Sequence, residues 1–116
     1  MASLTVTITD HTKRFNLAQL FRAPAGNSYA GATIVNFDKQ AHVLVQYVTL
    51  QQDLLSAANY IYVGDKNVSA TNFGIQVPRG DPMPLFPASG NTIRLSDLWV
   101  TCDIDGAIFH LLTQVM

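Results

Sequence analysis

Apolar residues recur along the chain in short runs of strand length, most of them with a period of two. In the first run, Leu4, Val6 and Ile8 alternate with three threonines, which places the apolar side chains on one face of a strand. The longest run, 42–50, is apolar on both faces and indicates a central strand. Further runs lie at 32–37, 60–63, 73–77, 92–95, 98–102 and 107–112. The pattern predicts an all-β fold.

Turn residues between the runs indicate how the strands begin and end. A Gly-Asp pair stops the strand 60–63, and Pro78, which has no N–H to donate, closes the strand 73–77. The next stretch, 79–91, holds three prolines and two glycines, so we expect it to cross the edge of the sheet without pairing. Residues 51–59 are expected to form a loop with one turn of helix.

The last two strands are expected to form a hairpin. Gly106 ends a short polar turn and supplies the positive φ that such a loop needs, so 107–112 should return antiparallel to 98–102. Short strands with turn signals between them and almost no helix are typical of two packed antiparallel sheets. The sequence therefore predicts an antiparallel β-sandwich, of which the jelly roll is one form.

Residues 10–31 interrupt this pattern and form a candidate arm or long loop. Within this stretch, Asn16 can cap a single helical turn that carries apolar side chains on one side and ends before Pro24. A turn this short is not stable alone, so either the sandwich of the same chain or a neighbouring chain must cover it. We expect contact with a neighbouring chain, and the candidate interface residues are Phe15, Leu17, Leu20, Phe21 and Arg22.

Composition favours a single domain that self-associates. With 116 residues the chain can build one hydrophobic core, so we expect one β-sandwich domain over 1–116. Apolar residues make up 48% and charged residues only 13%, and Glu, a good helix former, does not occur. That much apolar surface is hard to hide in one small sandwich. We therefore expect a homo-oligomer, either a dimer or a trimer.

Charge, the length of the apolar runs and the cysteine content argue against a nucleic-acid partner, a membrane span and a disulfide. The seven basic residues are scattered and the net charge is -1, so no basic run is available to bind a nucleic acid. No apolar stretch is long enough for a membrane span and the first residues lack a secretory signal, so we expect folding in the cytoplasm. The single cysteine, Cys102, cannot form an intrachain disulfide and is expected as a buried strand residue.

No combination of residues indicates catalysis or metal binding. The histidines, His11, His42 and His110, lie in three separate segments without the close spacing of metal ligands. Every carboxylate belongs to an aspartate in or beside a turn, where its side chain bonds the local backbone. No nucleophile motif of the G-x-S-x-G type occurs. We therefore expect no catalytic residue, no metal and no cofactor, and interpret the protein as a non-enzyme.

Two stretches in the second half of the chain resemble a known group of proteins. The first, 62–82, reads YVGDKNVSATNFGIQVPRGDP, and the second, 95–112, reads LSDLWVTCDIDGAIFHLL. They are similar to small β-sandwich virion proteins of tailed bacteriophages, which include head decoration or cement proteins. The shared features are strands that end in VGD or at a Pro/Gly turn, a VSxTNG-like turn, an LSDLWV strand and a DG turn. The chain departs from the group at Phe73, an aromatic inserted between Asn72 and Gly74.

The resemblance implies a structural protein of a phage virion, assembled in the host cytoplasm. The leading hypothesis is a capsid decoration or cement protein that binds and stabilises the assembled head, with the major capsid protein or other virion proteins as partners. The alternative within the virion is a tail, head-fibre or attachment module. A third hypothesis is a β-sandwich that binds a carbohydrate or another small ligand, and it requires a pocket with convergent polar groups.

Overall fold

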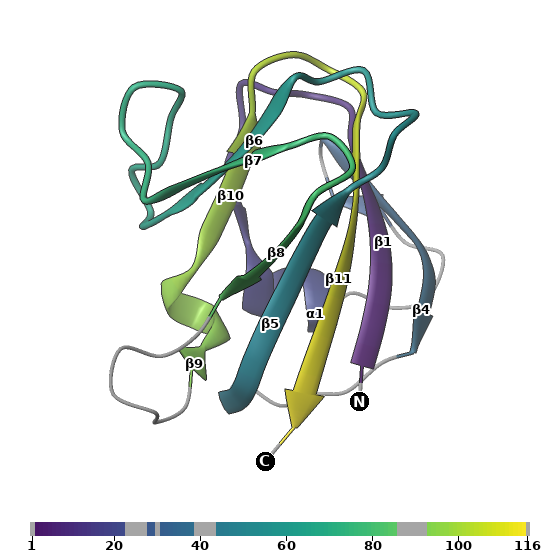
Figure 1. Ribbon diagram of the computed structural model, residues 1–116, viewed down its shortest axis with the longest axis vertical. Helices are drawn as coiled ribbons and strands as arrows, with labels where there is room; N and C mark the ends of the chain where they lie inside the picture. The colour runs from purple at the N-terminus through teal and green to yellow at the C-terminus, as the bar shows by residue number, and fades with distance from the viewer. Residues whose placement is uncertain (1, 23–27, 30, 39–43, 86–92, 116) are drawn as a thin grey trace.

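The computed structural model describes residues 2–22, 28–29, 31–38, 44–85 and 93–115 and is built mainly from β-strands (Figure 1). The helical elements of this described part are the helix α1 (Leu17–Arg22) and the 3-10 turn η1 (Leu95–Asp97). The strands are β1 (Ala2–Ile8), β2 (Phe15–Asn16), β3 (Ser28–Tyr29), β4 (Ala32–Asp38), β5 (Leu44–Gln52), β6 (Tyr60–Gly64), β7 (Ile75–Pro78), β8 (Pro82–Leu85), β9 (Ile93–Arg94), β10 (Trp99–Cys102) and β11 (Ala107–Val115). The all-β prediction is confirmed.

The strands form two antiparallel sheets that share one core. The larger sheet has the order β3-β4-β1-β11-β5-β8, and β9 pairs with one end of β5. The smaller sheet has the order β2-β10-β6-β7. Figure 1 shows β1, β11 and β5 side by side, with β6, β7 and β10 together at the upper left. This arrangement confirms the predicted antiparallel β-sandwich.

Eight of the strands pair in the nested order of a jelly roll. The outermost pair is β1 with β11, the next is β2 with β10, then β5 with β8, and the innermost is β6 with β7. One long hairpin gives this nesting when it is rolled so that its pairs are divided between two sheets. The connections β1–β2, β5–β6, β7–β8 and β10–β11 therefore pass from one sheet to the other.

The predicted hairpin between 98–102 and 107–112 is wrong. β10 pairs with β2 and β6 in the smaller sheet, whereas β11 pairs with β1 and β5 in the larger sheet. Gly106 does have the positive φ expected of it, +95°. A glycine in this conformation reverses the chain direction, but it does not decide which strand becomes the partner.

The prediction that 79–91 crosses the sheet edge without pairing is wrong for its first part. β8 pairs with β5 and places Pro82 opposite Gln51 and Pro84 opposite Thr49. Successive backbone N–H positions point to opposite sides of a strand, so two prolines two positions apart can both face the side away from β5. β8 has β5 as its one neighbour in the described sheet order, which makes it an edge strand that tolerates both prolines.

The helix α1 forms where the sequence predicts a capped turn. The backbone N–H groups of Ala18 and Gln19 donate to Asn16 Oδ1 at 3.1 and 3.4 Å. Asn16 Nδ2 also donates to Ser96 O at 2.8 Å, which joins the cap to η1. Figure 1 shows α1 behind β5 and β11 in the lower half of the molecule. In the described part of the chain, no helix is both long and apolar enough to cross a membrane.

Candidate functional site

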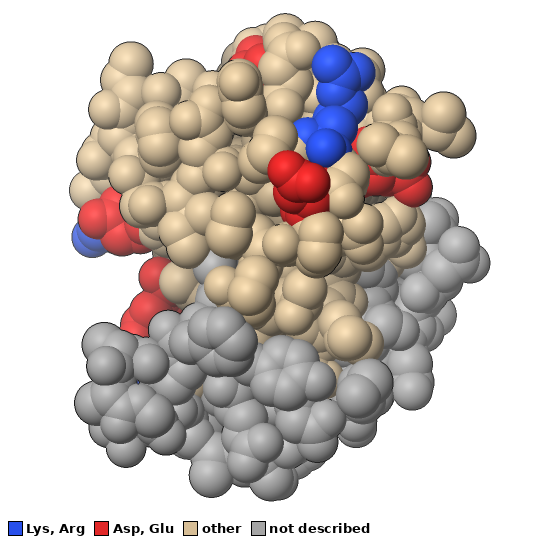
Figure 2. All heavy atoms as spheres, in the orientation of Figure 1, with Lys and Arg blue, Asp and Glu red and all other residues tan. Residues whose placement is uncertain are grey.

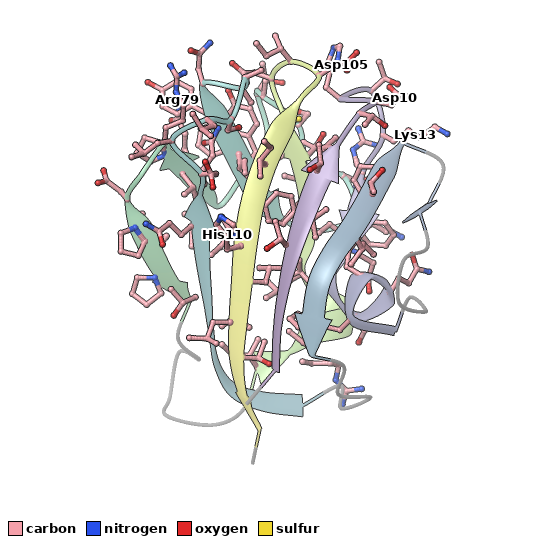
Figure 3. The ribbon with its side chains drawn as sticks, turned by 90° about the vertical axis from the view of Figure 1, so that its right-hand side faces the viewer. Asp10, Lys13, Arg79, Asp105 and His110 are labelled. Atoms are coloured by element: carbon pink, nitrogen blue, oxygen red, sulfur yellow. The ribbon has the colours of Figure 1, made fainter. Side chains whose placement is uncertain are left out.

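The connections β1–β2, β5–β6, β7–β8 and β10–β11, four of those that pass between the sheets, gather at one end of the sandwich, which we call the loop end. The loop end comprises residues 9–14, 53–59, 79–81 and 103–106. Backbone hydrogen bonds join its parts, since Ala57 N donates to Gly106 O at 3.1 Å and Gly106 N donates to Ile8 O at 2.8 Å. Figure 1 shows these connections at the top of the molecule, and Figure 3 shows Asp10 and Asp105 there.

The β5–β6 connection, 53–59, is fixed by an aspartate at its start. Asp53 Oδ1 accepts the N–H of Leu55 at 2.8 Å, and Asp53 O accepts the N–H of Ser56 at 3.0 Å. The second carboxylate oxygen of Asp53 lies 2.9 Å from His110 Nε2 on β11. The turn of helix predicted in this stretch is absent, because the Asp53 side chain bonds the local backbone in a tight turn instead.

Buried side chains under this connection tie it to the core. The hydroxyl oxygen of Ser56 accepts the N–H of Ile108 at 3.0 Å and Nε2 of Gln52 at 2.9 Å. Gln52 is wholly buried, and its Nε2 also donates to Ala58 O at 2.6 Å. Breaking buried hydrogen bonds leaves unsatisfied polar groups, which is costly. The backbone of the connection is therefore held in one place.

Two glycines let neighbouring connections pack closely against this one. A Cβ on Gly80 would lie 2.8 Å from Leu54 Cδ2, and a Cβ on Gly106 would lie 2.9 Å from Ala57 Cβ. Both glycines have positive φ, +84° and +95°, which residues with a side chain rarely adopt. The connections of the loop end therefore pack as one unit.

Three large apolar side chains project into solvent from this support. Leu54 is 76% exposed, Leu55 is 85% exposed and Ile104 is 44% exposed. The hydrogen bonds of Asp53 and Ser56 fix the backbone that carries the two leucines, so these side chains cannot turn into the core. Exposed apolar side chains that lie together and are rimmed by polar groups mark protein interaction sites.

The loop end also carries charged side chains. Figure 2 shows basic and acidic side chains next to one another near the top of one face, with uncharged surface around them. Protein interfaces commonly combine apolar side chains with polar and charged ones. The acidic residues of the loop end are Asp10, Asp53, Asp81, Asp103 and Asp105, and the basic residues are Lys13, Arg14 and Arg79.

Two histidine–aspartate pairs connect parts of this end. His11 Nδ1 lies 2.6 Å from Asp105 Oδ1, and His110 Nε2 lies 2.9 Å from Asp53 Oδ2. The backbone N–H of His11, and then its imidazole, lower the pKa of Asp105. The pKa of Asp53 is lowered first by the backbone N–H of Leu55 and then by the His110 ring. Both carboxylates are therefore ionised at neutral pH.

One hydrogen-bonded series of side chains has the composition of a catalytic triad: Thr5, His110 and Asp53. Thr5 Oγ1 lies 2.9 Å from His110 Nδ1, which completes the series, and Figure 3 shows His110 below and to the left of Asp10. A triad also needs an oxyanion hole of free N–H donors. Thr5 stands within β1, whose backbone is paired with β4 on one side and β11 on the other. We therefore interpret the hydrogen bonds between Thr5, His110 and Asp53 as a structural link that joins β1, β11 and the loop end.

The candidate interface residues of the 10–31 segment lie in the core of their own protomer. Among the described side chains, Phe15 is 6% exposed, Phe21 is 2% exposed, and Leu17 and Leu20 are wholly buried. This placement corresponds to the lid alternative, in which the sandwich of the same chain covers the helical turn. In this arrangement the four side chains are not available to contact another chain. The side chain of Arg22 lies outside the described part.

The remaining residues considered for chemistry are separated. His42 lies outside the described residues, and His11 and His110 each pair with a different aspartate. Among the described residues, no three histidine, cysteine or acidic side chains come together as a group that could hold a metal ion. Cys102 is 4% exposed, its thiol donates to Ile104 O at 3.1 Å, and burial raises its pKa to about 12. A thiol in this state is a poor nucleophile.

Sequence reasoning alone does not find the loop end. Leu54 and Leu55 follow an aspartate and precede small residues, without the period of a strand or the length of a helix. The one local signal of their exposure is that two leucines stand next to each other beside turn residues. The contacts that hold this pair outward come from β11 and from the β10–β11 connection, more than forty residues away in the chain.

Comparison with protein-family models, with curated proteins and with solved structures finds no match in any of the three. The function therefore has to be inferred from the residues and their geometry.

Proposed function

We propose that the protein is a non-enzymatic structural protein of a phage virion, of the decoration or cement type, and that its loop end binds the assembled shell. One observation carries the proposal: Leu54 and Leu55 are 76% and 85% exposed on a turn that buried hydrogen bonds hold in place. Residues that the fold needs for its own stability are normally buried, so this exposure points to a partner.

The energetics of such a surface favour binding to another protein. Burying one leucine side chain contributes about 1.5–3 kcal/mol. A backbone that is already fixed avoids much of the conformational cost of ordering a loop on binding. Interfaces draw most of their free energy from a few residues in well-packed positions that exclude water. Leu54, Leu55 and Ile104 are the exposed large apolar side chains that the described loop end offers for such contacts.

The residues that carry the resemblance to phage virion proteins shape a turn. Asp65 Oδ1 accepts the N–H of Asn67 at 2.8 Å, and Asp65 O accepts the N–H of Val68 at 3.0 Å. Ser69 and Asn72 then exchange backbone hydrogen bonds of 2.9 and 3.2 Å. These contacts give the VGD and VSxTN stretches of this chain a structural role in the β6–β7 connection.

Stabilisation of a shell by such a protein follows from mass action. A protein that binds only the assembled lattice shifts the assembly equilibrium away from dissociation. If several copies are held together in a dimer or trimer, each further contact forms at a high effective concentration. The proposed partners are therefore the major capsid protein, or another virion protein, and further copies of this chain.

Binding to purified shells tests the proposal. Shells of the source phage that lack the protein are mixed with wild type, with a Leu54→Ser/Leu55→Ser double variant, and with Phe73→Ser as a matched control. Phe73 is also exposed, at 41%, but lies on the β6–β7 connection. The double variant should lose roughly a hundredfold in affinity, and the control should bind like wild type.

Two results would change the conclusion. Equal binding by the double variant and wild type would remove the loop end from the interface. Binding of wild type to tails or fibres, without binding to heads, would favour the alternative of a tail, head-fibre or attachment module.

A further inference from the structure

The outer face of the smaller sheet carries a cavity of about 210 Å³ that is lined in part by residues of the loop end. Its floor is the end of β10, including Thr101 and Asp103. One wall is the β1–β2 connection with Thr12 and Arg14, and the opposite wall is the β6–β7 connection with Ser69. The cavity therefore lies between two connections that are far apart in the sequence.

Hydrogen bonds between its walls and floor preform this cavity. Arg14 Nε donates to Val68 O at 2.5 Å, which joins the two walls directly. Thr101 Oγ1 lies 3.2 Å from His11 O and 2.9 Å from Lys13 O, which fixes the β1–β2 connection to the floor. Ligand sites are usually preformed in this way, since a rigid cavity avoids the cost of ordering on binding.

The polar groups around the cavity include both donors and acceptors. Arg14 Nε donates to Val68 O, and the two NH₂ groups of Arg14 have no hydrogen-bond partner among the described residues. The Asp103 carboxylate accepts the backbone N–H groups of Asn59 and Tyr60 and Nδ2 of Asn59, which leaves about one of its four acceptor positions. Thr12 and Ser69 also line the walls, and their hydroxyls are hydrogen-bonded to Asp10 and Thr71.

The charges of these groups narrow the class of ligand. Arg14 and Asp103, which carry opposite charges, both line the cavity, so neither a phosphate nor an organic cation is favoured. A nucleic acid is also disfavoured, because the net charge of the chain is -1. Groups that both donate and accept, as sugar hydroxyls do, match this set.

A row of aromatic rings lies next to the cavity. Tyr62 is the cross-strand neighbour of Thr101, and its ring centroid is 5.0 Å from that of Phe73 and 6.4 Å from that of Tyr60. Tyr60 is 39% exposed and Phe73 is 41% exposed, whereas Tyr62 between them is 6% exposed. The face of an aromatic ring carries partial negative charge and attracts polarised C–H groups, such as those of a pyranose ring.

We propose that this face of the smaller sheet binds a carbohydrate, with one sugar in the cavity and a neighbouring sugar against the exposed rings. Arg14 and Asp103 bind the hydroxyls of the first sugar as donor and acceptor. Phe73 and Tyr60 contact the apolar faces of the sugars that follow. The inference goes beyond the proposed role in the virion, because it does not use the exposed leucines of the loop end.

A glycan array of bacterial and mammalian oligosaccharides, probed with the labelled protein, provides the first test. The strongest-binding oligosaccharide is then titrated into wild type and variants by calorimetry. Phe73→Ala should weaken binding roughly threefold to tenfold, and Arg14→Ala roughly tenfold or more. Leu55→Ser is the control, because Leu55 lies outside the cavity and the aromatic row, and this variant should bind the oligosaccharide like wild type.

The same measurements can overturn the proposal. If folded wild-type protein binds no oligosaccharide on the array, the proposal is refuted. Binding that both Phe73→Ala and Arg14→Ala leave unchanged would place the glycan elsewhere and would equally refute the site. If Arg14→Ala lowers the thermal midpoint because it releases Val68, Phe73→Ala and Tyr60→Ala decide the matter, since both remove exposed rings.

Discussion

Replacing Phe21 by alanine removes one of the largest fully buried side chains of the described part of the chain. Phe21 is 2% exposed and belongs to the core together with Leu17 and Leu20, which are wholly buried. Loss of burial alone accounts for about 1.5–3 kcal/mol, and the cavity that remains raises the expected cost to about 3–5 kcal/mol. Domains of this kind are stable by about 5–15 kcal/mol, so the variant should lose a large part of its stability.

Urea unfolding of the isolated protomer, followed by circular dichroism, measures this loss. The midpoint should fall while the dependence of the unfolding free energy on urea stays unchanged. Leu55→Ala is the matched control, because Leu55 is 85% exposed and surface substitutions usually stay within about 0.5 kcal/mol. Unchanged protomer stability in Phe21→Ala, combined with lost self-association or shell binding, would show that the 10–31 segment is an arm onto another chain.

Three further predictions concern the loop end and the core. Because the pKa values of Asp53 and Asp105 are lowered in the folded state, their hydrogen bonds stabilise the fold above the ordinary carboxyl pKa of about 4. That contribution is lost as the pH falls through the lowered pKa values, so Asp53→Asn should show a smaller fall in thermal midpoint on acidification than wild type; equal falls would contradict this. The Cys102 thiol, whose pKa burial raises to about 12, should resist iodoacetamide at pH 8 in the native protein and react once the chain is unfolded; rapid alkylation of the native protein would show an accessible thiolate. Gly106→Ala should cost at least about 1–2 kcal/mol, because φ is +95° and the new Cβ would lie 2.9 Å from Ala57, and an unchanged melting curve would refute the close packing.

Features that depend on neighbouring residues are predictable from the sequence. The alternation of Leu4, Val6 and Ile8 with threonines gives β1, and Val6 and Ile8 are wholly buried as the pattern requires. Asn16 caps α1, and Gly106 has the positive φ that its position in a turn requires. In each case the residues that decide the structure lie within a few positions of one another.

Features that depend on distant partners are not predictable in this way. The turn at Gly106 fits a hairpin locally, yet β10 and β11 belong to different sheets because each finds better partners elsewhere in the chain. The segment with Pro82 and Pro84 pairs with β5 because the edge of the larger sheet lies beside it. The exposure of Leu54 and Leu55 likewise depends on His110, Ile108 and Gly106, which follow about fifty residues later. Such contacts are set by topology, which local hydrophobic patterns do not encode.

The most direct test of the central claim is an electron-microscopy map of the source virion at a resolution that shows side chains. The account predicts the jelly roll on the outside of the head, with the loop end against the shell and with Leu54, Leu55 and Ile104 buried in the contact. A map in which the protein is absent from the virion, or in which the loop end faces solvent while another surface contacts the shell, would contradict it.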